Sequence, residues 1–369
     1  MRKSLLALII SILLLALCLT AYHAWLSPNR NEGTIVVTDA LGRTVKIKTP
    51  INKVIITGKS AWPIITVAYM FPNAKNVLIN LSASINVPLF QKIDPNIKSK
   101  TVQTTELSAE AIAGAKPDVV ILKSTMTMKE LGDQLEGLDI KVVYVDFENL
   151  ENYIRDLKVL GKIFMDEKRG EKLARYYNET YNFITSRTKT LAINEREKVL
   201  FLYYSTKGGI ITFNVPGSGW LQTFMIEAAG GSSLSKELSG AGWNPVNFEQ
   251  IAKWNPDVIF LVTYSKSPTS SDLKRQLLEN ATWSSISAVQ SGRVYAVPDD
   301  CNVGALGSWD CPGSRWIIGL EWMAKKINPE LFSSDLDIIA ETRKFYMEMY
   351  GLSQSDAEAI INQITGDFP

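Results

Sequence analysis

Aromatic and basic side chains that could recognise a ligand follow the predicted strands of this 369-residue chain. In α/β proteins, ligands bind where parallel strands reach their carboxyl ends, so we expect these side chains to meet in one cleft. Aromatic faces suit a bulky, flat ligand, and Lys and Arg suit a negatively charged one, as in a metal chelate or corrinoid. The candidate ligand-binding residues are Lys59, Ser60, Trp62, Lys123, Ser124, Tyr204, Trp220, Trp243, Tyr264, Trp309 and Arg315.

The sequence lacks the residues that the common catalytic sites need. His23 is the only histidine and lies beside the N-terminal apolar segment, so histidine ligation of a metal or haem iron in the cleft is excluded. Tyr or carboxylate ligation stays open. A Ser-His-Asp hydrolase needs a histidine, and cluster enzymes need more than the three cysteines present. No Walker-type loop occurs. We therefore expect a binding protein that is not an enzyme and holds no cofactor or resident metal.

The charge balance excludes a nucleic-acid partner. Lys and Arg number 39 and Asp and Glu number 38, and no long basic run occurs. A nucleic-acid binder would carry a basic patch or stripe.

The N-terminus is typical of an exported protein. Arg2 and Lys3 precede an apolar run, Leu5 to Leu17, which is short for a spanning helix and suits an export signal. Cys18 follows directly in a sequence that resembles a lipobox, where the cysteine is acylated and anchors the protein. Leu17 departs from that motif, since a small residue usually stands there, and an uncleaved signal anchor is the alternative. Both place the protein outside the cytoplasm and tethered to a membrane.

Cys301 and Cys311 are close in sequence and separated by a glycine-containing loop. In an oxidising compartment, we expect them to form a local disulfide, which would stabilise the fold by about 3 kcal/mol. A thiolate metal site is the alternative, but further soft ligands are missing nearby.

The predicted elements form two α/β lobes. Short apolar strands beginning at Val54, Val77, Val119 and Val142 alternate with helices after a hairpin over residues 34–49. A helical segment of about 25 residues from Asp166 would reach roughly 37 Å, enough to cross from one lobe to another. A second series of strands follows, at Val199, Gly209, Val258 and Arg293. The expected parts are an anchor and tether (1–33), a first lobe (34–164), an interdomain helix (165–192) and a second lobe (193–369).

One unit occurs in both predicted lobes. Glu110 and Glu249, 139 residues apart, each begin the pattern E-x-I-x(4)-PD before an apolar strand. Ser108 and Asn247 are suitable N-cap residues, which places both glutamates in the first turn of a helix, where the helix dipole favours negative charge. Capping alone would explain each glutamate, but not the same unit in each lobe.

These paired units, with the long helix between them, resemble the substrate-binding proteins of ABC importers for ferric siderophores, haem and cobalamin. The stretches INKVIITGKSAWP, PGSGWLQTFMIEAAGGSS and WSSISAVQSGRVYAVPDD fit the same family in the same order. The resemblance implies an α/β fold with two Rossmann-like lobes, each a mainly parallel sheet flanked by helices, joined by one long interdomain helix. It also implies that Glu110 and Glu249 contact an ABC permease in the membrane. We expect a monomer that captures a metal chelate.

Three other functions stay open. A small oxyanion such as molybdate, which some members of this group are thought to bind, would use backbone N–H groups and Ser hydroxyls at helix N-termini. The stretches GKSAW and PGSGW could supply these groups. A surface adhesin lipoprotein and a chelatase-like enzyme are the more remote alternatives.

Overall fold

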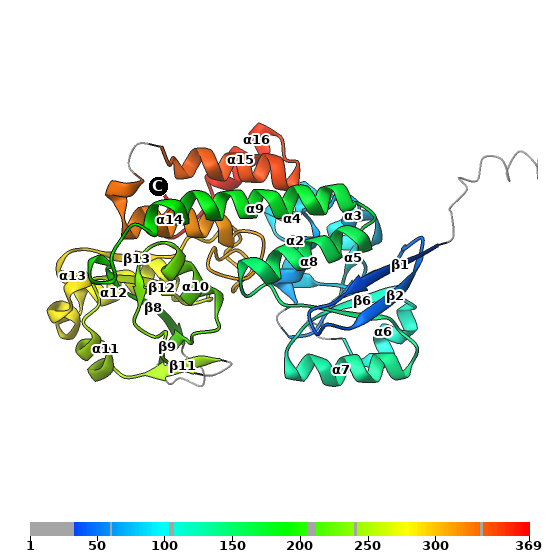
Figure 1. Ribbon diagram of the computed structural model, residues 1–369, viewed down its shortest axis with the longest axis horizontal. Coiled ribbons are helices and arrows are strands. Elements are labelled where there is room, and N and C mark those ends of the chain that lie inside the picture. The colour runs from blue at the N-terminus through cyan, green and yellow to red at the C-terminus, as the bar shows by residue number, and fades with distance from the viewer. Residues whose placement is uncertain (1–32, 60, 103–106, 206–211, 240–241, 333–334) are drawn as a thin grey trace, which may run out of the picture.

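The two larger β-sheets, each with helices packed against it, lie in opposite halves of the molecule (Figure 1). We call the elements from β1 to α8 the first half and those from β8 to α14 the second half. The N-terminal segment with Cys18 and His23, and the residue Ser60, lie outside the described residues. The computed structural model describes residues 33–59, 61–102, 107–205, 212–239, 242–332 and 335–369.

The first half contains a three-stranded parallel sheet in the order β3-β6-β7. The antiparallel hairpin β1–β2 precedes it, and Gly42 takes a φ of 75° in its turn, a conformation that costs glycine little. The predictions of the hairpin and of these three strands are confirmed. The strands are β1 (Gly33–Thr38), β2 (Thr44–Thr49), β3 (Val54–Ile56), β4 (Leu81–Ser82), β5 (Thr101–Val102), β6 (Val119–Lys123) and β7 (Val142–Val145).

The predicted strand at Val77 is wrong. Val77 ends a short helix, and Leu78 then makes a single parallel bridge with Val54. A short apolar run suits a helix end and a buried strand equally, so its sequence alone does not decide between them. The helices of the first half are α2 (Trp62–Ala68), α3 (Ala74–Val77), α4 (Pro88–Ile93), α5 (Ile97–Lys100), α6 (Ala109–Ala115), α7 (Met126–Gly137) and α8 (Leu150–Ile163).

The second half contains a mixed sheet in the order β11-β9-β8-β12-β13, with β10 also paired to β8. Strands β8, β12 and β13 are parallel, as predicted, and β9 runs antiparallel to both β8 and β11. Its strands are β8 (Lys198–Ser205), β9 (Thr212–Pro216), β10 (Ser232–Ser233), β11 (Trp243–Val246), β12 (Val258–Val262) and β13 (Val294–Ala296). The remaining helices are α9 (Glu167–Thr188), α10 (Leu221–Ala228), α11 (Phe248–Trp254), α12 (Ser270–Glu279), α13 (Ser287–Gln290), α14 (Trp316–Ile327), α15 (Ile338–Tyr350) and α16 (Gln354–Ile361).

Both sheets are covered by apolar packing on both faces. In β6, Val119 and Ile121 join a large hydrophobic core that includes residues of both halves. Val120 and Leu122, which point the other way, join a smaller cluster with α6 and α7. Strand β8 divides its residues between two clusters in the same way. Burial on both faces explains why these strands are continuous apolar runs without alternation.

The repeated unit folds alike in the two halves. Ser108 accepts a hydrogen bond from the third residue of α6, and Asn247 does the same at α11. Each helix ends in a left-handed residue, Lys116 with φ 52° and Asn255 with φ 43°. The predicted N-caps and short helices are therefore confirmed, and the two copies also share a C-terminal geometry that the sequence comparison did not reveal.

The Asp of the Pro-Asp pair in each copy accepts hydrogen bonds from backbone amides at the start of the neighbouring strand. An Asp118 carboxylate oxygen accepts hydrogen bonds from the backbone amides of Asn52 and Lys53, which lead into β3. Asp257 accepts the amide of Lys198, the first residue of β8, at 2.9 Å. The repeat of the Asp therefore has a structural cause, because the carboxylate satisfies amides at a strand end.

Helices α8 and α9 pack closely against each other. Asp166 accepts from the amide of Arg169 and so caps α9, which has 22 residues. At the crossing, a Cβ on Gly170 would lie 2.9 Å from the carbonyl oxygen of Leu157 and 3.2 Å from the Cα of Gly161. The absence of side chains at both glycines lets the two backbones approach.

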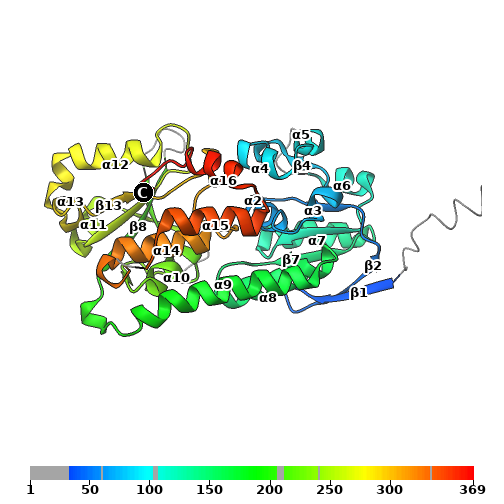
Figure 2. The same ribbon diagram turned by 90° about the horizontal axis from the view of Figure 1, so that it is seen from above.

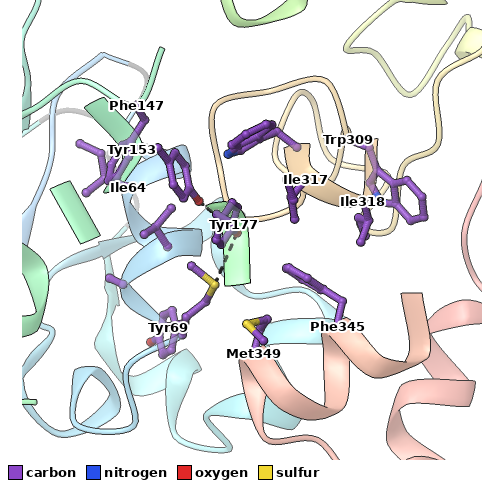
Figure 3. Close-up of a cluster of buried hydrophobic side chains, with 14 of the residues drawn as sticks. Ile64, Tyr69, Phe147, Tyr153, Tyr177, Trp309, Ile317, Ile318, Phe345 and Met349 are labelled. Atoms are coloured by element: carbon purple, nitrogen blue, oxygen red, sulfur yellow. Dashed lines mark hydrogen bonds between the residues drawn. The ribbon is translucent and has the colours of Figure 1, made fainter. Parts of the chain in front are cut away.

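The two halves share a continuous joint. Helix α9 packs against α8 of the first half and against α10 and α14 of the second, and Figure 2 shows it running along both. Tyr153 of α8, Tyr177 of α9 and Ile317 of α14 are buried in one cluster (Figure 3). The Tyr153 hydroxyl donates to the carbonyl of Gly313 at 2.7 Å, and Tyr177 donates to that of Ser314. A buried core therefore connects the halves.

Candidate ligand-binding site

Carboxyl ends of strands from both sheets contribute side chains to the space between the halves. Lys123 is the last residue of β6, and Glu148 follows β7. Tyr203 lies near the end of β8, and Tyr264 follows β12. This is the position where α/β sheets place ligands.

Lys123 and Glu148 form an ion pair that reaches the second half. The Lys123 ammonium contacts one carboxylate oxygen of Glu148. The other oxygen accepts the backbone amide of Leu221, the first residue of α10, at 3.4 Å. The two side chains are only 12% and 23% exposed. A carboxylate of the first half thus sits at the N-terminus of a helix of the second half, which favours negative charge.

An aromatic cluster adjoins this contact. Trp220, the residue before α10, lies 5.2 Å from Trp243 between ring centroids. Trp243 lies 5.1 Å from Tyr203, and Tyr203 lies 5.0 Å from Tyr264. All four residues are partly exposed. These half-buried rings form a wall on which a flat ligand could stack.

The buried side chain of Asp310 is hydrogen-bonded to Tyr264 of this cluster. Its carboxylate accepts from the Tyr264 hydroxyl at 2.5 Å and from the Gln222 amide at 3.0 Å, and Ser308 donates to its second oxygen at 2.5 Å. Complete burial raises the pKa of Asp310, and the three hydrogen bonds oppose that rise. Tyr264 has a φ of 47°, which is uncommon for a large side chain, so the hydrogen bond helps to fix a strained residue.

A cavity of about 540 Å³ lies on another side of Tyr264. Asn86, Val87 and Pro88 of the first half line it together with residues after β12 and β13. Its volume falls within the range typical of small-molecule sites. Many of the lining side chains carry hydroxyl or amide groups, so hydrogen bonding is available here beside the aromatic cluster.

The other predicted ligand-binding residues lie in different places. Lys59 is exposed after β3, and Trp62 is half-buried at the start of α2. Ser124 follows Lys123, and its amide donates to a carbonyl of β7. Tyr204 points to the other face of its sheet, where its ring lies 5.8 Å from Phe213. The Tyr204 ring therefore does not join the aromatic cluster.

The structure places Trp309 and Arg315 in the core instead of the cleft. Trp309 has no exposed surface and packs edge-on against Phe368. Arg315 is 2% exposed and forms an ion pair with buried Asp300 at 3.0 Å. Its other nitrogens donate to groups that include the Tyr350 hydroxyl. Both side chains are buried inside the protein, so neither is available to a ligand in the cleft.

The predicted disulfide is not formed. Cys301 and Cys311 are both free thiols in the core. The Cys301 thiol donates to Asp300 at 3.0 Å, and Cys311 lies beside Asp310. Burial, followed by the adjacent carboxylates, raises the pKa of each thiol. With pKa values raised above the ordinary thiol value, both sulfurs stay protonated at neutral pH.

The two repeated glutamates are exposed. Glu110 lies in the first turn of α6 and Glu249 in the first turn of α11, and Figure 1 places these helices in different halves on its lower side. Hydrogen bonds from its own backbone amide and from Ser108 lower the pKa of Glu110. Both side chains are accessible to a partner.

Sequence reasoning missed Glu148, Tyr203 and Asp310. Glu148 follows a predicted strand, so the strand-end rule that selected Lys123 would also have found it. Tyr203 could have been chosen over Tyr204 only by knowing which face of β8 meets the cleft. Asp310 offered no local signal, because its role depends on contacts with Gln222 and Tyr264.

Comparisons with known proteins agree with this architecture. Residues 75–301 match the family described as periplasmic binding protein. A periplasmic solute-binding protein from Veillonella parvula has a crystal structure that is 26% identical, with a TM-score of 0.71, over 89% of this chain and 97% of its own. YhfQ of Bacillus subtilis, named as an ABC transporter substrate-binding lipoprotein, is 28% identical over 80% of this chain and 91% of its own. The molybdate-binding protein MolA of Haemophilus influenzae is 20% identical over 86% and 91%.

The chain therefore belongs to the periplasmic binding protein family. Within it, the fold and relatives are those of class III substrate-binding proteins of ABC transporters, which confirms the resemblance inferred from the two glutamate units. The expectation of a binding protein that is not an enzyme is confirmed as well. Within the described residues, no helix combines the length and apolar character needed to span a membrane.

Proposed function

We propose that this substrate-binding protein captures a metal chelate, such as a ferric siderophore, haem or a corrinoid, between its halves and delivers it to a membrane permease. The aromatic cluster of Tyr203, Trp220, Trp243 and Tyr264 carries this proposal. The rings of this cluster are tilted against one another by 42° to 52°, and they offer large apolar faces that suit planar chelating groups.

The charge of the cleft also supports a bulky ligand. The ammonium of Lys123 is neutralised by Glu148, and Arg315 is buried, so Lys59 is the predicted basic residue that stays exposed. The free positive charge is therefore smaller than the sequence suggested. Binding would depend on aromatic contact more than on charge attraction.

Molybdate or another small oxyanion is the second candidate. The likeness to MolA over most of both chains favours it, although the identity is only 20%. The N-terminus of α10, which follows PGSGW, would supply amide donors. The amide of Leu221 is already bonded to Glu148, which weighs against a free anion at that position.

We further propose a domain division into residues 34–164, the interdomain helix 165–192 and residues 193–369, with little closure on binding. Helix α9 packs on both halves, and one hydrophobic core includes residues of both. The helices α15 and α16 also contact the first half, where Lys92 pairs with Asp356 at 2.5 Å. A large hinge motion would have to break this buried joint.

Delivery to the permease would use the two exposed glutamates. Glu110 and Glu249, one on each half, would pair with basic residues of the permease, and their spacing would check the orientation of the docked protein. Residues 1–33 would tether the protein to the membrane, through acylated Cys18 or as an uncleaved anchor. We infer that it acts as a monomer.

Tryptophan fluorescence tests the ligand class. The protein is titrated with a ferric siderophore, haemin, a corrinoid and sodium molybdate. We expect a chelate to quench emission with saturation, because Trp220 and Trp243 lie in the wall. Trp220→Phe and Trp243→Phe should each reduce the quenching, and Trp254→Phe on α11 should not. A saturable response to molybdate alone would contradict the chelate proposal.

A further inference from the structure

Glu148 already occupies the position that an anion would take in the cleft. Its carboxylate contacts the Lys123 ammonium and accepts the first amide of α10, so the cation and the helix N-terminus share one internal anion. The hydrogen bond joins residues 73 positions apart, from different halves of the molecule. Both side chains are largely withdrawn from water, so solvent screens the pair less than it would a surface pair.

The next residue of α10 adds a second acceptor to this end of the helix. Gln222 is 2% exposed, and Asp310 fixes its amide by accepting from Nε2 at 3.0 Å. Its Oε1 has no hydrogen-bond partner among the described residues. This buried carbonyl oxygen carries a partial negative charge, so it makes the N-terminal end of α10 less favourable for an oxyanion.

We propose that Glu148 determines the charge selectivity of the cleft by excluding small inorganic oxyanions from Lys123 and the α10 N-terminus. This inference rests on the proposed role of the cleft as the ligand site. In the cell envelope, sulfate and phosphate would compete for any open cationic pocket. The Glu148 carboxylate takes the place of sulfate or phosphate beside Lys123. The aromatic cluster stays available to a chelate.

The effect of removing the carboxylate follows from the same contacts. Glu148→Gln keeps the size of the side chain but removes the counter-ion of Lys123, whose side chain is only 12% exposed. A buried cation without a partner is unfavourable, so an anion from solution should take the vacated place. The amide of Leu221 would then donate to that anion.

Isothermal titration with sodium molybdate and sodium sulfate tests this inference. Glu148→Gln and Glu148→Ala should each bind molybdate at least tenfold more tightly than the wild type. The double variant Glu148→Gln/Lys123→Met should lose that gain. Glu151→Gln, an exposed acid in the first turn of α8, should behave as the wild type.

Two results would overturn the inference: tight molybdate binding by the wild type, or unchanged affinity in both folded Glu148 variants. Thermal unfolding establishes that the variants are folded. Titration with chelates is read separately. If no chelate binds but the Glu148 variants gain molybdate affinity, the proposed ligand class fails while the role of Glu148 stands.

Discussion

Glu321 places a carboxyl group inside the core of α14, where it is 4% exposed. Burial, with a further contribution from Glu341, raises its pKa from 4.5 to about 8. Its Oε2 has no hydrogen-bond partner in the part of the chain that the structure describes. The fold therefore holds this carboxyl group in its protonated form at neutral pH.

This proton makes stability depend on pH. Between pH 4.5 and about 8, the native state keeps a proton on Glu321 that the unfolded chain releases. The free energy of unfolding should therefore fall as pH rises through this window and level off above it. Glu321→Gln should remove that part of the decline, which urea denaturation at several pH values measures.

Glu348→Gln is the matched control for this prediction. Glu348 is an exposed acid on α15, so Glu348→Gln makes the same chemical change while Glu321 stays in the core, and the decline between pH 4.5 and about 8 should persist. A Glu321→Gln profile with the same slope as the wild type would show that the Glu321 carboxyl group ionises normally in the folded protein.

Single residues of the site could be predicted only where local sequence determines their position. Lys123 and Tyr264 were found because each stands at the carboxyl end of an apolar strand. Trp309 and Arg315 have the right side-chain chemistry for a ligand site, but they lie in an irregular segment. Whether such a segment is buried depends on distant elements, here α15 and the chain end, which their own sequence does not describe.

At the level of elements, the α8–α9 crossing determines how the two halves are joined. Gly161 and Gly170 bring the two backbones together, since a Cβ at Gly170 would lie 2.9 Å from the Leu157 carbonyl oxygen and a Cβ at Gly161 would be tightly packed at 3.2 Å. Since α9 also contacts α10 and α14, the way it packs on α8 determines where the second half lies relative to the first.

Gly170→Ala should destabilise the protein by about 1–3 kcal/mol, because the new methyl group would lie 2.9 Å from the carbonyl oxygen of Leu157. Denaturant unfolding gives the change in free energy. Gly114→Ala is the control: this glycine is in helix α6, and its Cβ would meet open space. A loss at Gly114 equal to that at Gly170 would rule out the packing explanation.

Most elements could be predicted because their patterns are local. The N-caps, the short helices and the apolar strands of the repeated unit each depend on neighbouring residues. Strand β11 and its antiparallel pairing with β9 were not predicted. The pairing of Trp243 with Pro216 joins residues far apart in the sequence, and local sequence does not determine it. The predicted disulfide failed for a related reason: closeness in sequence did not decide that Cys301 and Cys311 would contact different carboxylates.

For the whole molecule, one hydrophobic core includes residues of both halves, and we propose that Glu110 and Glu249, one on each half, are the two contact points for a permease. Glu110→Lys/Glu249→Lys should abolish uptake of the ligand by cells while leaving its affinity for the purified protein unchanged. Each single reversal should weaken uptake less than the pair. Transport assays and fluorescence titration of the same variants measure the two quantities.

The control replaces two other exposed acids, Glu179 on α9 and Glu330 after α14, with lysine. Uptake should then stay near the wild-type level, because the change in net charge is the same but the sites differ. Loss of ligand affinity in the Glu110/Glu249 variant would assign these residues to the fold or the cleft instead of the permease contact.

The most direct test of a chelate carrier is native mass spectrometry of the protein purified from its own cells. We predict an added mass that corresponds to one intact metal chelate and that is lost from a Trp220→Ala/Trp243→Ala variant. An added mass that corresponds to molybdate or another simple oxyanion, retained in that variant, would contradict the account.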